Sequence, residues 1–512
     1  MVSRLHSELT TVDSRRKLLY GVIFFWGALI TCGVLILIYN YLFDSATAKY
    51  YLFPWCIACG AVISAPSFYL LYKGRFNPFH PLVFPAWSYF FPGFVIGGLV
   101  LASGYSQPFF LAYIRDERTT LPLTFVYIML GFGGLTLGFV IPQAGKLGSA
   151  ISRRLPNWSI STEKVKFPAL ILFGVGLAAM LQSFVQGLFG YQKGYETPVY
   201  GGLVFSLGQL WLEASFLLWL HIFRSKVWKS SHYALIGLII VATFARSAFQ
   251  GNRGSLIHPM IAVGFAYAFS GRKMGLKQYT AGGAILVCGL LIGMVYGTYF
   301  RTVKGTEQGV SPTEYAGFVS SAMEGLSDQD LGSVLILGWD AALQRVESVS
   351  SMAVLVANYE TLAPYEENWG ISNNIYVDAA TSFIPRIFWP ERPVGLELSK
   401  YGDLYFDYSE NAFLITPMGD LLRNFGPAGV PLGMLVLGMI LRLIYAALIE
   451  RQAFSYWRTA MFFMLLTTIS YEATYGVILT YLLKCTVTAF AGVLIIRLFL
   501  YGSRQSHSPS PV

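Results

Sequence analysis

The sequence predicts an all-α polytopic membrane protein with about twelve transmembrane helices and one long, partly helical extracytoplasmic loop. Of its 512 residues, 55% are hydrophobic and only 12% are charged, which is about half the charged fraction of a soluble domain. Apolar runs of roughly 20 residues recur along the chain, each bounded by charge or by Gly, Pro or Asn, and this is the length of a membrane-spanning helix. The composition therefore excludes a large soluble enzyme.

The first apolar run, residues 18–43, follows Arg15, Arg16 and Lys17. It is too long for the apolar region of a signal peptide and no small-residue cleavage site follows it, so we expect it to be retained as a helix. The predicted spans are residues 18–43, 51–72, 82–103, 121–142, 167–188, 201–223, 232–250, 255–271, 279–300, 427–449, 459–476 and 478–500.

Basic residues orient these spans. With the N-terminus inside, the inner segments hold 21 of the 36 Lys and Arg residues. The short outer loops hold 5, namely Lys49, Arg115, Arg118, Lys193 and Arg253. Because cytoplasmic loops are enriched in Lys and Arg, we expect both termini in the cytoplasm. The net charge of +9 occurs as pairs and triplets at helix ends rather than as a dense basic block, so we expect no nucleic-acid partner.

One connection is far longer than the others. Residues 301–426 carry 17 of the 27 acidic residues and 7 basic residues, a local net charge of −10. They also contain three tryptophans and helix-like patterns, which are not typical of a disordered segment. We therefore predict a transmembrane bundle of about nine helices at 1–300, a large extracytoplasmic loop domain at 301–426, and C-terminal transmembrane helices with a short cytoplasmic tail at 427–512.

Motifs for metals, cofactors and ATP are lacking. All five cysteines lie in apolar runs, and the CxxC spacing of Cys56 and Cys59 has no second pair. The six histidines are scattered without ligand spacing. No nucleophile elbow or GxxxxGK[ST] loop occurs, so neither a serine hydrolase nor an ATP-driven pump is indicated. We expect no metal and no cofactor.

The segment "FARSAFQGNRGSL" places two arginines at the predicted outer face. Arg246 lies in the last turns of the seventh span and Arg253 in the tight outer turn. Arginines at membrane level usually face a cavity, pair with an anion, or extend to lipid headgroups. Because a guanidinium binds phosphate oxygens in a bidentate manner, an anion site is one interpretation of this pair and headgroup contact is the other.

Two further segments carry charge at the same face. In "SFIPRIFWPERPVG", prolines stiffen a loop that presents Arg386, Trp389 and Arg392, either for a ligand or as surface charges. In "ITPMGDLLRNFGPAGV", Asp420 and Arg423 are neighbours on a helix, as a catalytic pair or as a plain ion pair. The letters "NFGP" predict a helix stop followed by a restart.

Another carboxylate is expected at membrane level. Glu472 lies in "ISYEATYG", near the outer end of the eleventh span. Ionisable residues at this depth are functional candidates by default because they are costly there.

The three segments, in this order around one long outer loop, resemble the Wzy-type polymerases of O-antigen and other oligosaccharide repeat units in bacterial inner membranes. The matching residues are "ARSAFQGNRGSLI", "FIPRIFWPERP" and "TPMGDLLRNFGPAGV", and Arg253 to Gly264 fits the Arg-x10-Gly spacing of such polymerases. Where the family often has Glu after the Gly of T-x-x-G, this chain has Asp420, which is one methylene shorter.

The resemblance implies a metal-independent glycosyltransferase of the GT-C type. The growing glycan on undecaprenyl pyrophosphate would be transferred en bloc to a sugar of a new lipid-linked repeat unit. Membrane lipid and a chain-length regulator protein are further candidate partners. The residues implied for pyrophosphate and glycan binding are Arg246, Arg253, Arg301, Arg386, Trp389, Arg392 and Arg423. Those implied for catalysis are Arg253 and a proton-accepting carboxylate, either Asp420 or Glu472.

Two rival functions are weighed against this one. O-antigen ligases typically use a histidine in the long outer loop, and residues 301–426 contain none. A flippase or another transporter of polyprenol-linked glycans is expected to carry an internal repeat and charges near the membrane midplane. We find no repeat, and the middles of the spans are nearly free of charge.

Overall fold

The computed structural model describes the chain from residue 48 to residue 505 with internal gaps. The described ranges are 48–105, 108–158, 160–185, 201–251, 256–272, 275–305, 311–328, 330–381, 384, 388–389, 391–393, 396–408, 413 and 415–505, with 20–23, 25–27, 29 and 33 near the N-terminus. Two predicted site residues, Arg253 and Arg386, and most of the first predicted span lie outside these residues.

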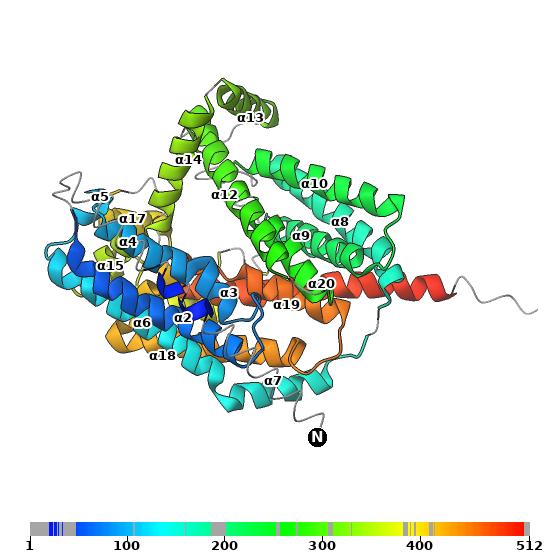
Figure 1. The fold of residues 1–512 in the computed structure, drawn as a ribbon, viewed down its shortest axis with the longest axis horizontal. Helices are drawn as coiled ribbons and strands as arrows, with labels where there is room; N and C mark the ends of the chain where they lie inside the picture. Colours follow the sequence, from blue (N-terminus) through cyan, green and yellow to red (C-terminus); the bar gives the residue numbers. More distant parts are fainter. Residues whose placement is uncertain are drawn as a thin grey trace, which may run out of the picture.

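All regular structure in the described ranges is helical, and no strand occurs there (Figure 1). The helices are η1 (Tyr50–Leu52), α2 (Phe53–Tyr72), α3 (Val83–Pro85), the π-helix η2 (Ala86–Ile96), α4 (Gly97–Ala102), α5 (Pro108–Leu111), α6 (Glu117–Val140), α7 (Pro142–Arg154), α8 (Thr162–Val185), α9 (Gly201–Arg224), α10 (Ser230–Gln250), α11 (Ile257–Phe269), α12 (Leu276–Lys304), α13 (Pro312–Ser327), α14 (Leu331–Val346), α15 (Val349–Asn368), α16 (Asn374–Thr381), α17 (Leu398–Phe406), α18 (Thr416–Leu448), α19 (Tyr456–Thr468) and α20 (Tyr475–Gln505).

The described part of the chain contains 8 helices long and apolar enough to cross a membrane, so the protein is a polytopic helical membrane protein. These segments are Tyr50–Tyr72, Val83–Ala102, Glu117–Val140, Thr162–Val185, Ser230–Gln250, Thr280–Lys304, Thr416–Leu448 and Tyr475–Leu498. The predicted spans 201–223, 255–271 and 459–476 coincide with α9, α11 and α19, which are not among the eight. Both α11 and α19 have only 13 residues.

Glycines allow the helices α6 and α18 to pack backbone against backbone. A Cβ atom on Gly138 would lie 1.9 Å from the carbonyl oxygen of Leu435, and one on Gly438 would lie 2.1 Å from that of Leu135. Small residues permit such close approach in membranes, where apolar burial alone gives little attraction between helices. This pair is the scaffold from which the first turns of α18 project.

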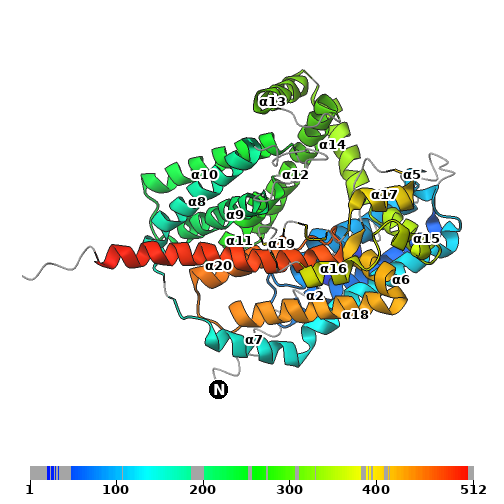
Figure 2. The same ribbon diagram turned by 180° about the vertical axis from the view of Figure 1, so that it is seen from behind.

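A second pair, α8 and α9, also packs closely, and Gly176 abuts the backbone of Trp211. Helix α20 contacts both of these helices as well as α16, α18 and α19. It therefore joins the α8–α9 pair to the part of the molecule that contains α18 (Figure 2).

Segments predicted to lie inside meet at one end of the bundle. Arg458 donates hydrogen bonds to the hydroxyl (2.7 Å) and carbonyl (3.2 Å) oxygens of Ser152. His221 lies 2.7 Å from the carbonyl oxygen of Thr162, and Arg272 donates to that of Phe223 at 2.7 Å. These contacts join four segments that the charge count assigns to one side of the membrane.

Segments predicted to lie outside meet in the same way. Lys49 forms an ion pair with Glu117. Helix α15 packs on α4, α5 and α6 and is tied to them by Asn358, which donates to the carbonyl oxygen of Tyr113 at 3.0 Å. Helices α15 to α17 thus cover this end of the bundle (Figure 2), whereas α13 and α14 project from it (Figure 1).

Helix α18 begins earlier than the predicted tenth span. The predicted span is 427–449, but the helix already begins at Thr416 and continues through a break at Gly426, where φ is 67° and ψ is −166°. The break confirms the stop and restart that "NFGP" predicts. The extra turns before it are buried against α15, and they bring Asp420 and Arg423 into contact with Asn374 at the start of α16.

Candidate functional site

The side chain of Arg423 lies at the centre of a buried polar network. Its Nη1 donates to Glu366 Oε2 at 2.8 Å and to the carbonyl oxygen of Ile371 at 2.9 Å. Its Nη2 donates to Asp420 Oδ1 at 3.1 Å and to the side-chain oxygen of Asn374. The side chain is fully buried, so a ligand cannot reach it without displacing protein groups. Arg423 therefore joins α15 and α16 to α18.

Glu366 is the second acid of this network. Tyr405 of α17 donates its hydroxyl to Glu366 Oε1 at 2.8 Å, so each carboxylate oxygen has a partner. Burial raises the pKa of Glu366, while Arg423 and the hydrogen bonds oppose that rise. The sequence lacks a signal for this pairing, because Glu366 precedes Arg423 by 57 positions.

Asp420 is also fully buried and accepts several hydrogen bonds. Besides Arg423, its donors are the side chains of Asn374 (3.1 and 3.3 Å) and Asn424 (3.2 Å). Its Oδ2 also accepts the backbone N–H groups of Tyr475 (2.9 Å) and Gly476 (3.4 Å). These two amides form the first turn of α20, and the carboxylate satisfies N–H groups that a helix start leaves unpaired. Both oxygens of Asp420 are thus occupied in holding α20.

The threonine of the T-x-x-G motif before Asp420 has an unusual backbone conformation. Thr416 has a φ of 65°, in the left-handed region that β-branched residues rarely adopt. Its hydroxyl accepts the N–H of Gly419 at 3.0 Å and so caps the first turn of α18. The T-x-x-G spacing therefore fixes the start of α18, and with it the position of Asp420 on this helix.

A pocket of about 250 Å³ opens beside this network, between residues 396–415 and the start of α20. Its charged pair is Arg345 and Glu472, which form an ion pair and are 49% and 35% exposed. The rest of the wall is mostly apolar: Leu396, Leu398, Phe413, Ile415, Ala473, Thr474 and Val477. Of the two candidate bases, Glu472 is therefore the one on the pocket.

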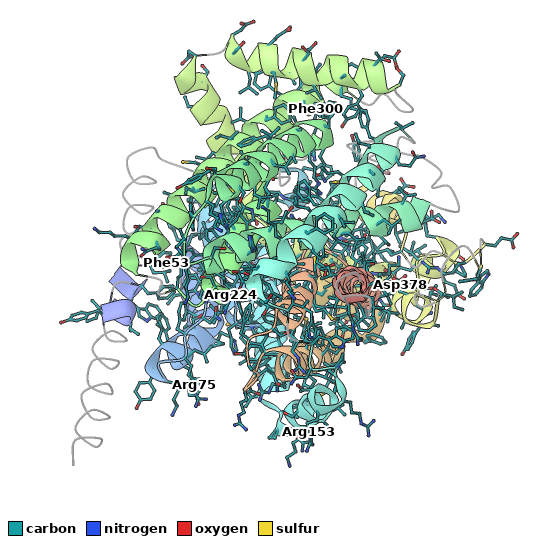
Figure 3. The ribbon with its side chains drawn as sticks, turned by 90° about the vertical axis from the view of Figure 1, so that its right-hand side faces the viewer. Phe53, Arg75, Arg153, Arg224, Phe300 and Asp378 are labelled. Atoms are coloured by element: carbon teal, nitrogen blue, oxygen red, sulfur yellow. The ribbon has the colours of Figure 1, made fainter. Side chains whose placement is uncertain are left out.

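Asp378 of α16 lies against the first turn of α20, and Figure 3 labels it beside that helix. A Cβ on Gly476 would lie 2.4 Å from its Oδ2 oxygen, which is buried and has no hydrogen-bond partner among the described residues. Burial, and next the nearby Asp420, raise the pKa of Asp378 to about 6, whereas Arg392 and Lys484 oppose the rise.

Of the predicted site residues that the structure describes, only Glu472 lines this pocket. Arg246 lies on α10 with its guanidinium 4.9 Å from the ring centre of Trp211, and no described carboxylate is within ion-pair distance. Arg301 is in the last turn of α12. Arg392 donates to the carbonyl oxygens of Thr381 (3.3 Å) and Ile384 (3.1 Å), and Trp389 is 38% exposed.

The structure thus brings together Asp420 and Arg423. Glu472 lies between α19 and α20, three residues before Tyr475, whose N–H group Asp420 accepts. The structure adds Arg345, Glu366, Asn374 and Asp378, which the sequence analysis missed. All four lie in the acidic segment 301–426, where many similar residues give no signal of which ones meet. Glu213 in the middle of α9 was also missed, although a carboxylate within a predicted span is a visible signal.

No group of three or more His, Cys, Asp or Glu side chains in the described ranges is arranged to hold a metal ion. Comparisons with known protein families, with curated proteins and with solved structures found no match to this chain.

Proposed function

We propose that this protein polymerises oligosaccharide repeat units carried on a lipid pyrophosphate, by glycosyl transfer at the outer face of a bacterial inner membrane. The observation that carries the proposal is the pocket with the Arg345–Glu472 pair, at the end of the bundle that the charge pattern predicts to face outward. The resemblance of three segments to Wzy-type polymerases supports it. Twelve spans, a GT-C arrangement and cytoplasmic termini belong to the same proposal.

The size and lining of the pocket favour a headgroup rather than a whole substrate. Ligand pockets for drug-sized molecules are about 300–1,000 Å³, so 250 Å³ suits a sugar ring or a pyrophosphate. The guanidinium of Arg345 is a suitable partner for phosphate oxygens. The apolar wall would exclude water from the reacting atoms and so strengthen the electrostatic interactions there.

In this scheme the acceptor hydroxyl attacks the anomeric carbon of the donor glycan. The new glycosidic bond forms as the bond to the lipid pyrophosphate breaks, and the proton of the hydroxyl passes to Glu472. Negative charge develops on the departing pyrophosphate, where Arg345 stabilises it more in the transition state than in the ground state. Undecaprenyl pyrophosphate is the proposed leaving group.

The test is complementation of a strain that lacks this gene, with the surface glycans resolved on a gel. The deletion strain should lose the long ladder and keep single repeat units. Glu472→Gln and Arg345→Met should each reduce ladder synthesis by about 10²-fold or more, as expected for loss of a base or of a charge donor. Glu397→Gln, an exposed carboxylate near the pocket, is the matched control and should restore the ladder.

Protein levels would be compared by immunoblot, so that loss of activity is separated from loss of protein. Normal ladders from Glu472→Gln and Arg345→Met would contradict the pocket assignment. Loss of even the single repeat unit in the deletion strain would contradict polymerisation, because it places the defect upstream.

One observation favours a transporter as the second candidate. Glu213 lies in the middle of α9, fully buried, and neither carboxylate oxygen has a hydrogen-bond partner among the described residues. Transporters place ionisable groups at such positions. A transporter of lipid-linked glycans predicts loss of all surface glycan on deletion, single units included, so the same gel distinguishes the two functions.

A further inference from the structure

The short segment Tyr475–Gly476 lies between two carboxylates. On one side Asp420 accepts both of its backbone N–H groups. On the other side Asp378 lies so close to Gly476 that only a glycine fits, because a Cβ there would be 2.4 Å from Asp378 Oδ2. The two acids come from different helices, α16 and α18, and both contact the start of α20.

The same segment is part of the pocket wall. Glu472, Ala473 and Thr474 precede it and Val477 follows it, and all four line the pocket. A shift of Tyr475–Gly476 must therefore move the carboxylate of Glu472 relative to anything bound between it and Arg345. A displacement of about 1 Å is enough to change the rate of a positioned reaction by about 10²-fold.

Three charged groups act on Asp378. Asp420 of α18 repels its ionised form, whereas Arg392 of the loop at 391–393 and Lys484 of α20 favour it. The buried Oδ2 has no hydrogen bond among the described residues to hold it in place. Its interaction with the start of α20 therefore depends on whether it carries a proton.

We propose that Asp378 is a positioning residue: through its contact with Gly476 it sets the place of the pocket wall at 472–477, and it does so differently in its neutral and ionised forms. This inference rests on the proposed function of the pocket. In the neutral form Asp420 alone holds the first turn of α20. In the ionised form the two carboxylates repel each other across Tyr475–Gly476, and the wall shifts away from the ligand.

With a pKa of about 6, Asp378 is neutral at pH 5 and ionised at pH 7.5. Because folding raises this pKa, the stabilisation from Asp378 is present at low pH and is lost as the pH rises through about 6. Asp378→Asn removes the ionisation and should keep the wall in its low-pH position at every pH.

The test uses the purified full-length protein and farnesyl pyrophosphate as the probe, in 0.5 M salt so that long-range repulsion between Asp378 and the probe is screened. The measured quantity is the ratio of the wild-type Kd to that of Asp378→Asn at each pH, which cancels ionisation of the probe itself. We expect a ratio near 1 at pH 5 and about 5 at pH 7.5, within the usual range of coupling between sites.

Two further variants keep the test decisive. Glu391→Gln, an exposed carboxylate in the adjacent loop, should behave as the wild type at every pH. Gly476→Ala forces the same contact apart without changing charge, and should weaken probe binding by about fivefold at both pH values. The thermal midpoint of the wild type should fall progressively below that of Asp378→Asn as the pH rises from 5 through about 6, and the difference should then level off.

A Kd ratio and a difference in thermal midpoint that both stay constant from pH 5 to 7.5 would overturn this inference and leave the proposed function intact. Binding of the probe by none of the proteins at any pH would overturn the proposed function, and this inference with it.

Discussion

Asp420 and Arg423 illustrate how far a pair of residues can be interpreted before its surroundings are known. Their spacing of three predicts contact on a helix, and the ion pair at 3.1 Å confirms that contact. Glu366 and Asn374 complete the network from two other helices. Both Nη atoms of Arg423 and the carboxylates of Glu366 and Asp420 then have protein partners, so the network joins α15 and α16 to α18 and α20. The Arg345–Glu472 pair is instead partly exposed.

Replacing Arg423 by Met should destabilise the protein strongly. The change leaves Glu366 and Asp420 buried without their counterion, which typically costs about 3–5 kcal/mol. The free energy of unfolding in detergent is the measurement. Lys400→Met removes an exposed ion pair with Glu397 and should change it by less than about 0.5 kcal/mol. Equal effects of the two changes would show that the network contributes no more than a surface pair.

At the scale of single elements, the contact between α6 and α18 determines the position of the site residues on α18, Asp420 and Arg423. Glycines on both helices let the backbones touch, so α18 is held against the bundle along its length. The break at Gly426 separates from the rest of α18 its first turns, which contact α15 and Asn374 of α16. The site thus depends on helix packing that involves none of its own residues.

Gly138→Leu should disrupt this pair, because a Cβ at 1.9 Å from the carbonyl oxygen of Leu435 meets backbone that cannot move aside. We expect a loss of about 3 kcal/mol, at the upper end of the usual cost of overpacking. The yield of folded protein on size exclusion after detergent extraction is the measurement. Gly133→Leu is the matched control on the same helix, since no atom lies within 4 Å of its Cβ position. Full recovery of Gly138→Leu would contradict the close packing.

At the scale of the whole molecule, the segments that the charge pattern predicts to lie inside contact one another, and so do those that it predicts to lie outside. Contacts of Ser152, His221 and Arg458 join the inner segments, and α15 to α17 cover the outer segments. The positive-inside rule supplies the orientation of that arrangement in the membrane.

Cysteine labelling in intact cells tests this orientation. In a variant lacking the five native cysteines, Glu367→Cys on α15 should react with a membrane-impermeant maleimide. Arg154→Cys at the end of α7 should react only after the cells are lysed. Both positions are exposed, so access depends on the side of the membrane alone. The reverse pattern would invert the topology and remove the pocket from the proposed side.

The helices themselves were predictable, because apolar length and flanking charge are local properties that determine a span. Asp420, Arg423 and Glu472 were also recognisable as candidates, since charge at membrane level is costly and rarely accidental. By itself the sequence thus determined a polytopic helical protein with a charged outer end.

Only the tertiary structure decided what each charge does. Whether Asp420 faces a ligand or caps α20 depends on the position of Tyr475, which is 55 residues away in the chain. The pairing of Glu366 with Arg423 and the contact of Asp378 with Gly476 likewise depend on packing between distant helices. Such long-range contacts leave no periodic trace in a single sequence, because many similar residues could occupy them.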